Sequence, residues 1–145
     1  MTNWNFISFN FPDRMMRHRN FLGELTPMDN LVGDFAFTLV GRGQHQVSFR
    51  SVNIPRHFLR HRDFRIHLDK RPATPDELFN LDSTFFFEVG LAEPEAFSFR
   101  SVNFPDRYLR HRDFQLFVEP PAGPDDELFR RDATFTRQPA AVRID

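Results

Sequence analysis

A histidine flanked by two arginines occurs three times in this sequence, and an aspartate follows each of the three histidines. The six residues are His18, His61, His111, Asp34, Asp82 and Asp132. The aspartate comes 16 residues after the histidine in the first case and 21 residues after it in the other two. A carboxylate accepts hydrogen bonds through two oxygens, and an imidazole donates or accepts according to its tautomer. Such a pair, meeting across a loop, would suit a ligand that carries several hydroxyl groups.

Each histidine lies in a phrase that the chain repeats. The phrase reads SFRSVNFPDRYLRHRDF from Ser98, SFRSVNIPRHFLRHRDF from Ser48 and, less closely, NFISFNFPDRMMRHRNF from Asn5. The second and third repeats align without a gap, and their similarity extends through the blocks DELF and D-x-T-F. Internal repetition of this kind is the first guide to architecture. We expect one domain, residues 1–145, with repeats at about 1–45, 46–95 and 96–145.

The pattern within one repeat predicts short strands. In the third repeat these are Phe97–Asn103, Tyr108–Arg112, Phe114–Glu119 and a fourth near Thr134-Phe135. The chain holds 20 Phe and 11 Pro, which favour pleated strands and turns respectively. No long segment has the 3.6-residue apolar period of a helix. We therefore predict an all-β fold, a β-trefoil of three repeats of about 48 residues with four strands each.

Closure around a three-fold axis would bring equivalent apolar residues together. The predicted core residues are Phe6, Phe49, Phe99, Met16, Leu59, Leu109, Phe37, Phe85 and Phe135. Burial of one such side chain contributes about 1.5–3 kcal/mol to folding. The core explains why apolar positions recur, and it leaves the recurring histidine unexplained.

The phrase YLRHRDF, followed by DELF and DATF, resembles the AbfB domain, also called carbohydrate-binding module family 42. This β-trefoil module is appended to fungal and bacterial α-L-arabinofuranosidases. The resemblance covers nearly the whole chain and is best in the second and third repeats. It implies recognition of arabinofuranose side chains of arabinoxylan or arabinan, in pockets that pair His61 with Asp82 and His111 with Asp132. It also implies a third pocket at His18 and Asp34, where the loop of the first repeat is shorter.

The resemblance also implies a catalytic glycosidase partner domain in related proteins and an extracellular location. The start of the chain, MTNWNFISFNFPDR, lacks the basic and apolar segments of a signal peptide, so the sequence itself assigns no location. We expect Tyr108 and Phe58 to cover the apolar face of the sugar. One pocket is expected to bind with a Kd of about 1 mM, or about −4 kcal/mol, and several pockets would add avidity.

The histidine and aspartate have a second interpretation as a buried structural pair that fixes a loop. The chain would then be a protein-interaction β-trefoil, such as an inhibitor, a toxin subunit or a scaffold. The two arginines beside each histidine are expected to point away from it, because neighbouring strand residues alternate faces. They would pair with nearby Asp and Glu residues.

Other functions are disfavoured by composition and motifs. The net charge is −1, from 19 basic and 20 acidic residues, which argues against a nucleic-acid partner. No apolar run approaches the roughly 20 residues of a membrane span. Cysteine is absent, and three histidines on separate lobes would not converge on a metal ion. We find no evident pair of catalytic carboxylates, and we predict neither an enzyme nor a cofactor.

Overall fold

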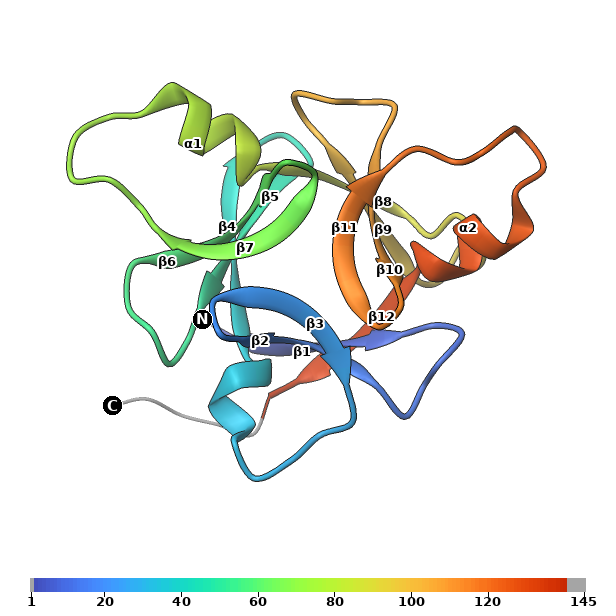
Figure 1. Ribbon diagram of the computed structural model, residues 1–145, viewed down its shortest axis with the longest axis horizontal. Helices are drawn as coiled ribbons and strands as arrows, with labels where there is room; N and C mark the ends of the chain where they lie inside the picture. Colours follow the sequence, from blue (N-terminus) through green and yellow to red (C-terminus); the bar gives the residue numbers. More distant parts are fainter. Residues whose placement is uncertain (1, 141–145) are drawn as a thin grey trace.

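The computed structural model describes residues 2–140, which form twelve β-strands and three short helical segments (Figure 1). The strands are β1 (Asn3–Ser8), β2 (Met15–Arg19), β3 (Leu22–Thr26), β4 (Phe37–Gly43), β5 (Gln46–Ser51), β6 (His57–Arg62), β7 (Arg65–Lys70), β8 (Phe85–Val89), β9 (Phe97–Ser101), β10 (Tyr108–Arg112), β11 (Gln115–Glu119) and β12 (Phe135–Pro139). The helical segments are η1 (Val32–Phe35), α1 (Glu77–Asp82) and α2 (Glu127–Asp132). The prediction of an all-β fold is confirmed. Within residues 2–140 no helix has the length and apolar character needed to cross a membrane.

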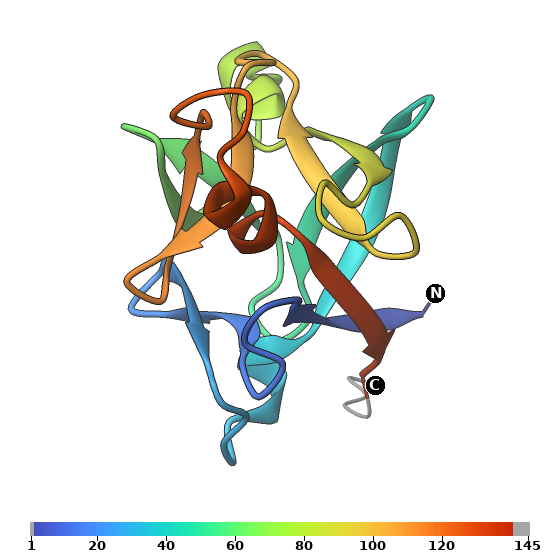
Figure 2. The same ribbon diagram turned by 90° about the vertical axis from the view of Figure 1, so that its right-hand side faces the viewer.

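The strands form one antiparallel sheet that closes on itself. The barrel wall contains the pairs β1–β12, β4–β5 and β8–β9. The hairpins β2–β3, β6–β7 and β10–β11 meet at one end, where β3, β7 and β11 pair with one another. Figure 1 shows these three strands curving around the centre of the molecule. Figure 2 shows the first and last strands, β1 and β12, side by side in the wall.

Three phenylalanines, one from each repeat, meet inside the barrel. The ring centroids of Phe6, Phe49 and Phe99 are 5.2, 5.7 and 4.8 Å apart, and the rings contact edge to face. Such contacts add about 0.5–1.5 kcal/mol per pair to the burial itself. All nine core residues predicted from the repeat are buried, with at most 1% of their surface exposed. The repeated apolar positions therefore identify the core correctly.

Each of the three hairpins turns on two residues with positive φ. In the second repeat these are Asp63 (φ 52°) and Phe64 (φ 60°), and the same geometry occurs at Asn20-Phe21 and Asp113-Phe114. This is the favoured twist for a two-residue hairpin, but it normally selects Asn, Asp or Gly. The carbonyl of Phe64 accepts a 2.8 Å hydrogen bond from the amide of Val118 in the next hairpin. A glycine carbonyl would do the same, so the aromatic side chain is not required by the turn.

The DELF block forms helices α1 and α2, where the sequence indicated no helix. Asp76 caps α1 by accepting a 3.0 Å hydrogen bond from the amide of Phe79, and Asp126 does the same for Phe129 in α2. Phe79 and Phe129 are buried beneath the helices. The acidic residues of DELF are thus helix caps and first-turn residues, which complement the positive end of a helix. A six-residue helix is too short to give a periodic pattern in the sequence.

We predict that Phe49→Ala lowers the free energy of unfolding by about 3–5 kcal/mol, because it opens a cavity at the meeting point of three rings. Phe21→Ala is the control, since that ring is 54% exposed. We expect it to cost less than about 1 kcal/mol. Urea unfolding followed by fluorescence measures both. Equal losses for the two variants would contradict the assignment of the core.

Candidate functional site

The structure brings each predicted histidine and aspartate together, with an asparagine between them. In the second repeat, His61 Nε2 lies 3.5 Å from Asp82 Oδ1. The Oδ1 atom of Asn103 lies 3.0 Å from His61 Nε2, and its Nδ2 donates a 2.9 Å hydrogen bond to Asp82 Oδ1. We call this arrangement the His–Asn–Asp bridge. It joins two side chains of one repeat to an asparagine of the next.

The other two repeats contain the same bridge. His111 Nε2 lies 3.4 Å from Asp132 Oδ1, and Asn10 makes hydrogen bonds of 2.8 Å to both. In the first repeat, His18 Nε2 lies 3.7 Å from Asp34 Oδ1, and Asn53 makes hydrogen bonds of 2.8 Å to both residues.

The asparagines follow one another around the barrel. Asn53 of the second repeat serves the first, Asn103 of the third serves the second, and Asn10 of the first serves the third. A serine two residues earlier positions each asparagine. For example, Ser101 Oγ donates to Asn103 Oδ1 at 3.1 Å and accepts from the amide of Phe104. The sequence interpretation missed the asparagines, although the motif S-V-N repeats in the last two copies.

The first arginine of each Arg-His-Arg run joins the same network, so the expectation that it points away is wrong. In the second repeat, Arg60 Nη2 donates to Asp82 Oδ2. The Nε atom of Arg60 donates to the carbonyl of His61 at 3.2 Å, which bends the side chain around the edge of its own strand. Arg17 and Arg110 make the same contacts. A long side chain can thus return to the opposite face, which the alternation of strand positions does not anticipate.

The second arginines follow the expectation. Their side chains are about half exposed, at 47–52%, and each is paired with an acidic residue on the neighbouring strand. The pairs are Arg19 with Glu24, Arg62 with Asp69, and Arg112 with Glu119. Exposed pairs of this kind add little to stability.

The hydrogen bonds assign the tautomer of each histidine. Because Asn103 Nδ2 donates to Asp82, its Oδ1 faces the imidazole, and His61 Nε2 must carry a proton to donate to it. In the neutral imidazole the other nitrogen, Nδ1, keeps a lone pair. Nδ1 has no hydrogen-bond partner among the described residues. It is not among the side-chain atoms that are both fully buried and unpaired, since Arg65 Nε is the only such atom in residues 2–140. His61 Nδ1 therefore reaches solvent as a free acceptor, although the residue is only 4% exposed.

Two phenylalanines flank the imidazole in the second and third repeats. Phe64 stacks on His61 at 6.2 Å, Phe104 meets it edge-on at 5.4 Å, and the two phenyl rings are 5.1 Å apart. Phe114 and Phe11 take the same positions around His111. Phe11, Phe104 and Phe114 are 37–38% exposed. An aromatic surface thus borders each of these two histidines.

The first repeat is different at this surface. Phe21 is present and 54% exposed, but Ile54 replaces the second aromatic ring. The other two histidines each have an arginine nearby, with Arg107 lying 3.6 Å over the ring of Phe64 and Arg14 lying 3.6 Å over that of Phe114. At the equivalent position beside His18 the chain has His57.

Tyr108 and Phe58, expected to cover a sugar ring, lie three residues before a histidine on the same strand, and so on its opposite face. Phe58 is 5% exposed and packs on Phe79 of α1 at 6.3 Å. Tyr108 packs on Phe129 of α2 at 6.1 Å, and burial raises the pKa of its hydroxyl. The aromatic rings beside the histidines belong instead to the hairpin turns, at Phe64 and Phe114, and to the residues that follow the asparagines, at Phe104 and Phe11.

Burial lowers the pKa of His111 from its ordinary value of 6.5, while the negative charge of Asp132 acts in the opposite direction. The imidazole is therefore neutral at pH 7, in agreement with an unprotonated Nδ1. Among residues 2–140 no group of three histidine or acidic side chains has the arrangement of a metal site.

The sequence matches the profile of the alpha-L-arabinofuranosidase B (ABFB) domain over residues 37–137. This chain belongs to the AbfB domain family. Comparison with the curated proteins finds no match. The matched region includes the whole second repeat and the third as far as Arg137. It therefore contains the complete bridge of His61, Asn103 and Asp82, and also His111 and Asp132, whose asparagine, Asn10, lies outside the match.

Solved structures share the fold of this chain. The AbfB chain is similar to an arabinofuranosidase complexed with arabinofuranosyl-alpha-1,2-xylobiose, with a TM-score of 0.85 and 23% identity. The match covers 96% of this chain and 31% of the arabinofuranosidase, so the chain spans less than a third of that protein.

Two smaller proteins resemble the whole chain. The BEL β-trefoil has a TM-score of 0.71 at 16% identity, over 95% of this chain and 92% of its own. The designed three-fold symmetric protein ThreeFoil has a TM-score of 0.70 at 5% identity, over 93% and 96%. These likenesses show the fold, which is a β-trefoil.

We predict that Asn103→Ala lowers the free energy of unfolding by about 1–3 kcal/mol, because it leaves His61 Nε2–H and Asp82 Oδ1 without their partner. The control is Asn80→Ala, which removes a 3.2 Å hydrogen bond from Arg71 near the surface. It should cost less than about 1 kcal/mol. Urea unfolding measures both, and an Asn103 variant as stable as the control would refute a structural role for the bridge.

The lowered pKa of His111 predicts a pH dependence of stability. The unfolded chain, with an ordinary pKa of 6.5, takes up a proton before the folded chain does. The contribution of His111 is thus present above pH 6.5 and is lost as the pH falls towards the folded pKa. The melting temperature of the wild type should fall between pH 7.5 and 5.5 by more than that of His111→Gln. Parallel pH curves for the two proteins would rule this contribution out.

Proposed function

We propose that this AbfB domain is a non-catalytic carbohydrate-binding module that recognises terminal arabinofuranose or a similar side chain of plant-type polysaccharides. We place one pocket beside each His–Asn–Asp bridge, in a single domain of three repeats at about 1–45, 46–95 and 96–145. Membership of the AbfB family and the similarity to an arabinofuranosidase complexed with an arabinofuranosyl sugar support this proposal.

The observation that carries the proposal is the unused nitrogen of each buried histidine. In the second repeat, His61 Nε2 is committed to Asn103, and Nδ1 remains an acceptor open to solvent. A sugar hydroxyl can donate to this nitrogen. The carboxylate of Asp82 uses one oxygen for Asn103 and the other for Arg60, and each carboxylate oxygen has capacity for a further hydrogen bond.

The turn phenylalanines supply the second part of the pocket. A phenylalanine with φ near 60° costs of order 1 kcal/mol compared with residues that favour this conformation. All three hairpins nevertheless place a phenylalanine there, at Phe21, Phe64 and Phe114. The faces of Phe64 and Phe114 are partly covered by Arg107 and Arg14, so the exposed parts of the rings border the hydrogen-bond acceptors. Such a border matches a furanose ring, which has an apolar face of C–H groups and an edge of hydroxyls. The cost of the turn is explained if the ring contacts the sugar.

The pockets differ in the affinity that we expect. Those of the second and third repeats have both phenylalanines, whereas the first repeat has Ile54 and His57 in place of one aromatic ring and one arginine. Only 3–5% of each histidine is exposed, so one pocket offers few contacts and should bind with a Kd of about 1 mM. Binding to a branched polymer through two or three pockets would be tighter through avidity.

The same network argues against catalysis. Glycoside hydrolysis normally uses two carboxyl groups on either side of one bond. In the second repeat the two nearest carboxylates, Asp69 and Asp82, are both held by the guanidinium of Arg60. A cation therefore occupies the position between them. Any catalytic partner domain would be supplied by another part of a longer protein, as the length of the arabinofuranosidase suggests.

The test uses two substitutions of one histidine. His61→Gln places an amide NH₂ near the former Nε2, so that it can still donate to Asn103, but it removes the acceptor at Nδ1. We expect this variant to keep its melting temperature within a few degrees and to lose binding at the second pocket. His61→Asn removes the Nε2 donor and should lower the melting temperature. Titration with an arabinofuranosyl xylo-oligosaccharide, followed by NMR, measures each pocket separately.

A protein-interaction β-trefoil is the second candidate, and one observation favours it. Each His–Asn–Asp bridge is buried and connects two repeats, which gives it a structural reason to recur without any ligand. If this candidate holds, His61→Gln leaves every sugar-induced shift unchanged or no shift occurs for the wild type. That result would overturn the carbohydrate proposal. The proposal would be supported if His61→Gln lost the sugar-induced NMR shifts of Phe64 and Phe104 and kept those of the other pockets.

A further inference from the structure

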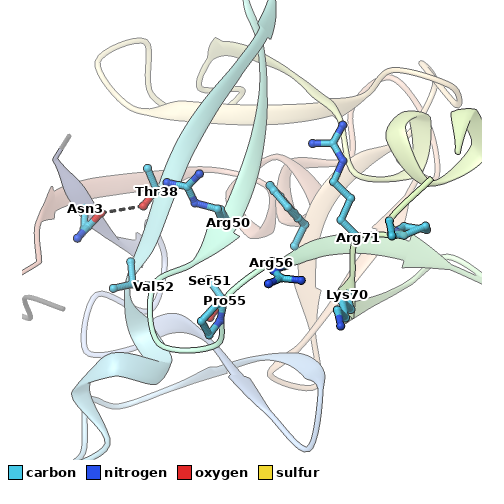
Figure 3. Close-up of a pocket in the computed structure, with 12 residues that line it drawn as sticks. Asn3, Thr38, Arg50, Ser51, Val52, Pro55, Arg56, Lys70 and Arg71 are labelled. Carbon is cyan, nitrogen blue, oxygen red and sulfur yellow. Dashed lines mark hydrogen bonds between the residues drawn. The ribbon is translucent and has the colours of Figure 1, made fainter. Parts of the chain in front are cut away.

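A cavity of about 870 Å³ lies between the first and second repeats. Its lining contains no histidine, asparagine or aspartate of any bridge, although it includes Ser51, which positions Asn53. Its walls come from the start of β1, from β4 and β5, from the turn between β5 and β6, and from β6, the end of β7 and the loop that follows (Figure 3). The lining residues are Asn3, Thr38, Arg50, Ser51, Val52, Pro55, Arg56, Phe58, Lys70, Arg71, Pro72 and Ala73. The volume lies in the range typical of small-molecule sites.

Four of the lining side chains are cations, and none is an anion. They are Arg50, Arg56, Lys70 and Arg71, which Figure 3 shows around one hollow. None of the four forms a salt bridge with another described residue, and Arg71 donates only to the neutral Asn80. The second arginines of the Arg-His-Arg runs, by contrast, all have acidic partners. The cavity is therefore a local excess of positive charge in a chain with a net charge of −1.

The third repeat shows that this charge is specific to the second. At the position equivalent to Arg50, Arg100 makes two hydrogen bonds to Glu88 at 2.8 and 2.9 Å. The residues equivalent to Arg56, Lys70 and Arg71 are Asp106, Pro120 and Pro121. The fold thus forms equally well without these cations. Their presence in one repeat requires another explanation.

A fifth cation lies close to the same cavity. The guanidinium of Arg42 lies over the ring of Phe58 at 5.4 Å, and that of Arg71 lies over it at 5.8 Å. The pKa of Arg42 is lowered, first by burial and then by the positive charges of Arg71 and Arg50. These side chains therefore repel one another, and a bound anion would relieve that repulsion.

The remaining lining is largely apolar. Val52, Pro55, Phe58, Pro72 and Ala73 form a surface without hydrogen-bonding side chains. A ligand that matches the whole cavity needs an apolar body as well as an anionic group. Inorganic phosphate has no such body. A sugar acid has one, because its ring presents C–H groups on one face and carries a carboxylate that arginine binds through two parallel hydrogen bonds.

We propose that this cavity binds the carboxylate of a uronic acid residue in an acidic glycan. Arg50 and Arg71 hold the carboxylate, and the apolar surface around Phe58 contacts the sugar ring. The choice of a sugar as the body of the ligand rests on the proposed carbohydrate-binding function. The site adjoins the first histidine pocket but uses none of the bridge residues, so the domain would bind two features of one polysaccharide, a neutral furanose and an acidic sugar.

The experiment compares a xylo-oligosaccharide that carries one glucuronate with the same oligosaccharide that carries glucose instead, by calorimetric titration. We expect the wild type to bind the acidic form at least about tenfold more tightly, and Arg50→Gln and Arg71→Gln each to remove about tenfold of this affinity. Arg100→Gln is the matched control and should leave this affinity unchanged, because Arg100 is paired with Glu88. Melting temperatures verify that each variant is folded, and Arg71, in a loop, provides a test should Arg50→Gln unfold.

Three results would overturn the proposal. These are equal binding of the acidic and neutral oligosaccharides, equal losses for Arg100→Gln and Arg50→Gln, and complete competition by inorganic phosphate at the concentration of the sugar. The last would identify a general anion site. Failure of arabinofuranosyl binding, with glucuronate binding retained, would instead refute the histidine pockets alone.

Discussion

The fold and the candidate pockets both depend on one amide group held between an imidazole and a carboxylate of the preceding repeat. Asn103 accepts from His61 and donates to Asp82, and Asn53 and Asn10 do the same for their neighbours. An unpaired polar group at these buried positions would cost about 1–3 kcal/mol each. The bridge therefore holds consecutive repeats together, and it also sets the tautomer that leaves one nitrogen of the neutral histidine free. The fold and the proposed binding depend on the same hydrogen bonds.

The periodic part of this arrangement could be predicted from the sequence. The core residues, the strands and the pairing of each histidine with its aspartate follow from positions that recur, because symmetry places equivalent residues in equivalent surroundings. The asparagines were missed because Asn103 lies 42 residues from His61 and belongs to a different repeat. Arg60 bends around the edge of its strand because its side chain is long, and helix α1 forms because Asp76 caps it. Neither feature produces a periodic pattern in the sequence.

The repeats also show which positions are free to diverge. A residue that supports the bridge or the core is the same or similar in all three, as Ser8, Ser51 and Ser101 illustrate. Residues in the turn that follows each asparagine can differ more, because not all of them contact the bridge or the core. At one of these positions the second repeat has Arg56 and the third has Asp106. New binding chemistry can arise at such positions without loss of the barrel. The proposed uronate site would be an example, since its cations occur in only one repeat.

The three bridges differ in how much chain each must close. The Asn–Asp hydrogen bonds of the first and second repeats span 19 and 21 residues, whereas that between Asn10 and Asp132 spans 122. The entropic cost of closing the longest loop exceeds that of the others by about 1.5 kcal/mol. During synthesis from the N-terminus, two of the links can form on the emerging polypeptide, and the last must wait until Asp132, at the end of α2, has left the ribosome. A ribosome-bound chain would thus be an open, two-thirds ring, with Asn10 exposed until its distant partner arrives.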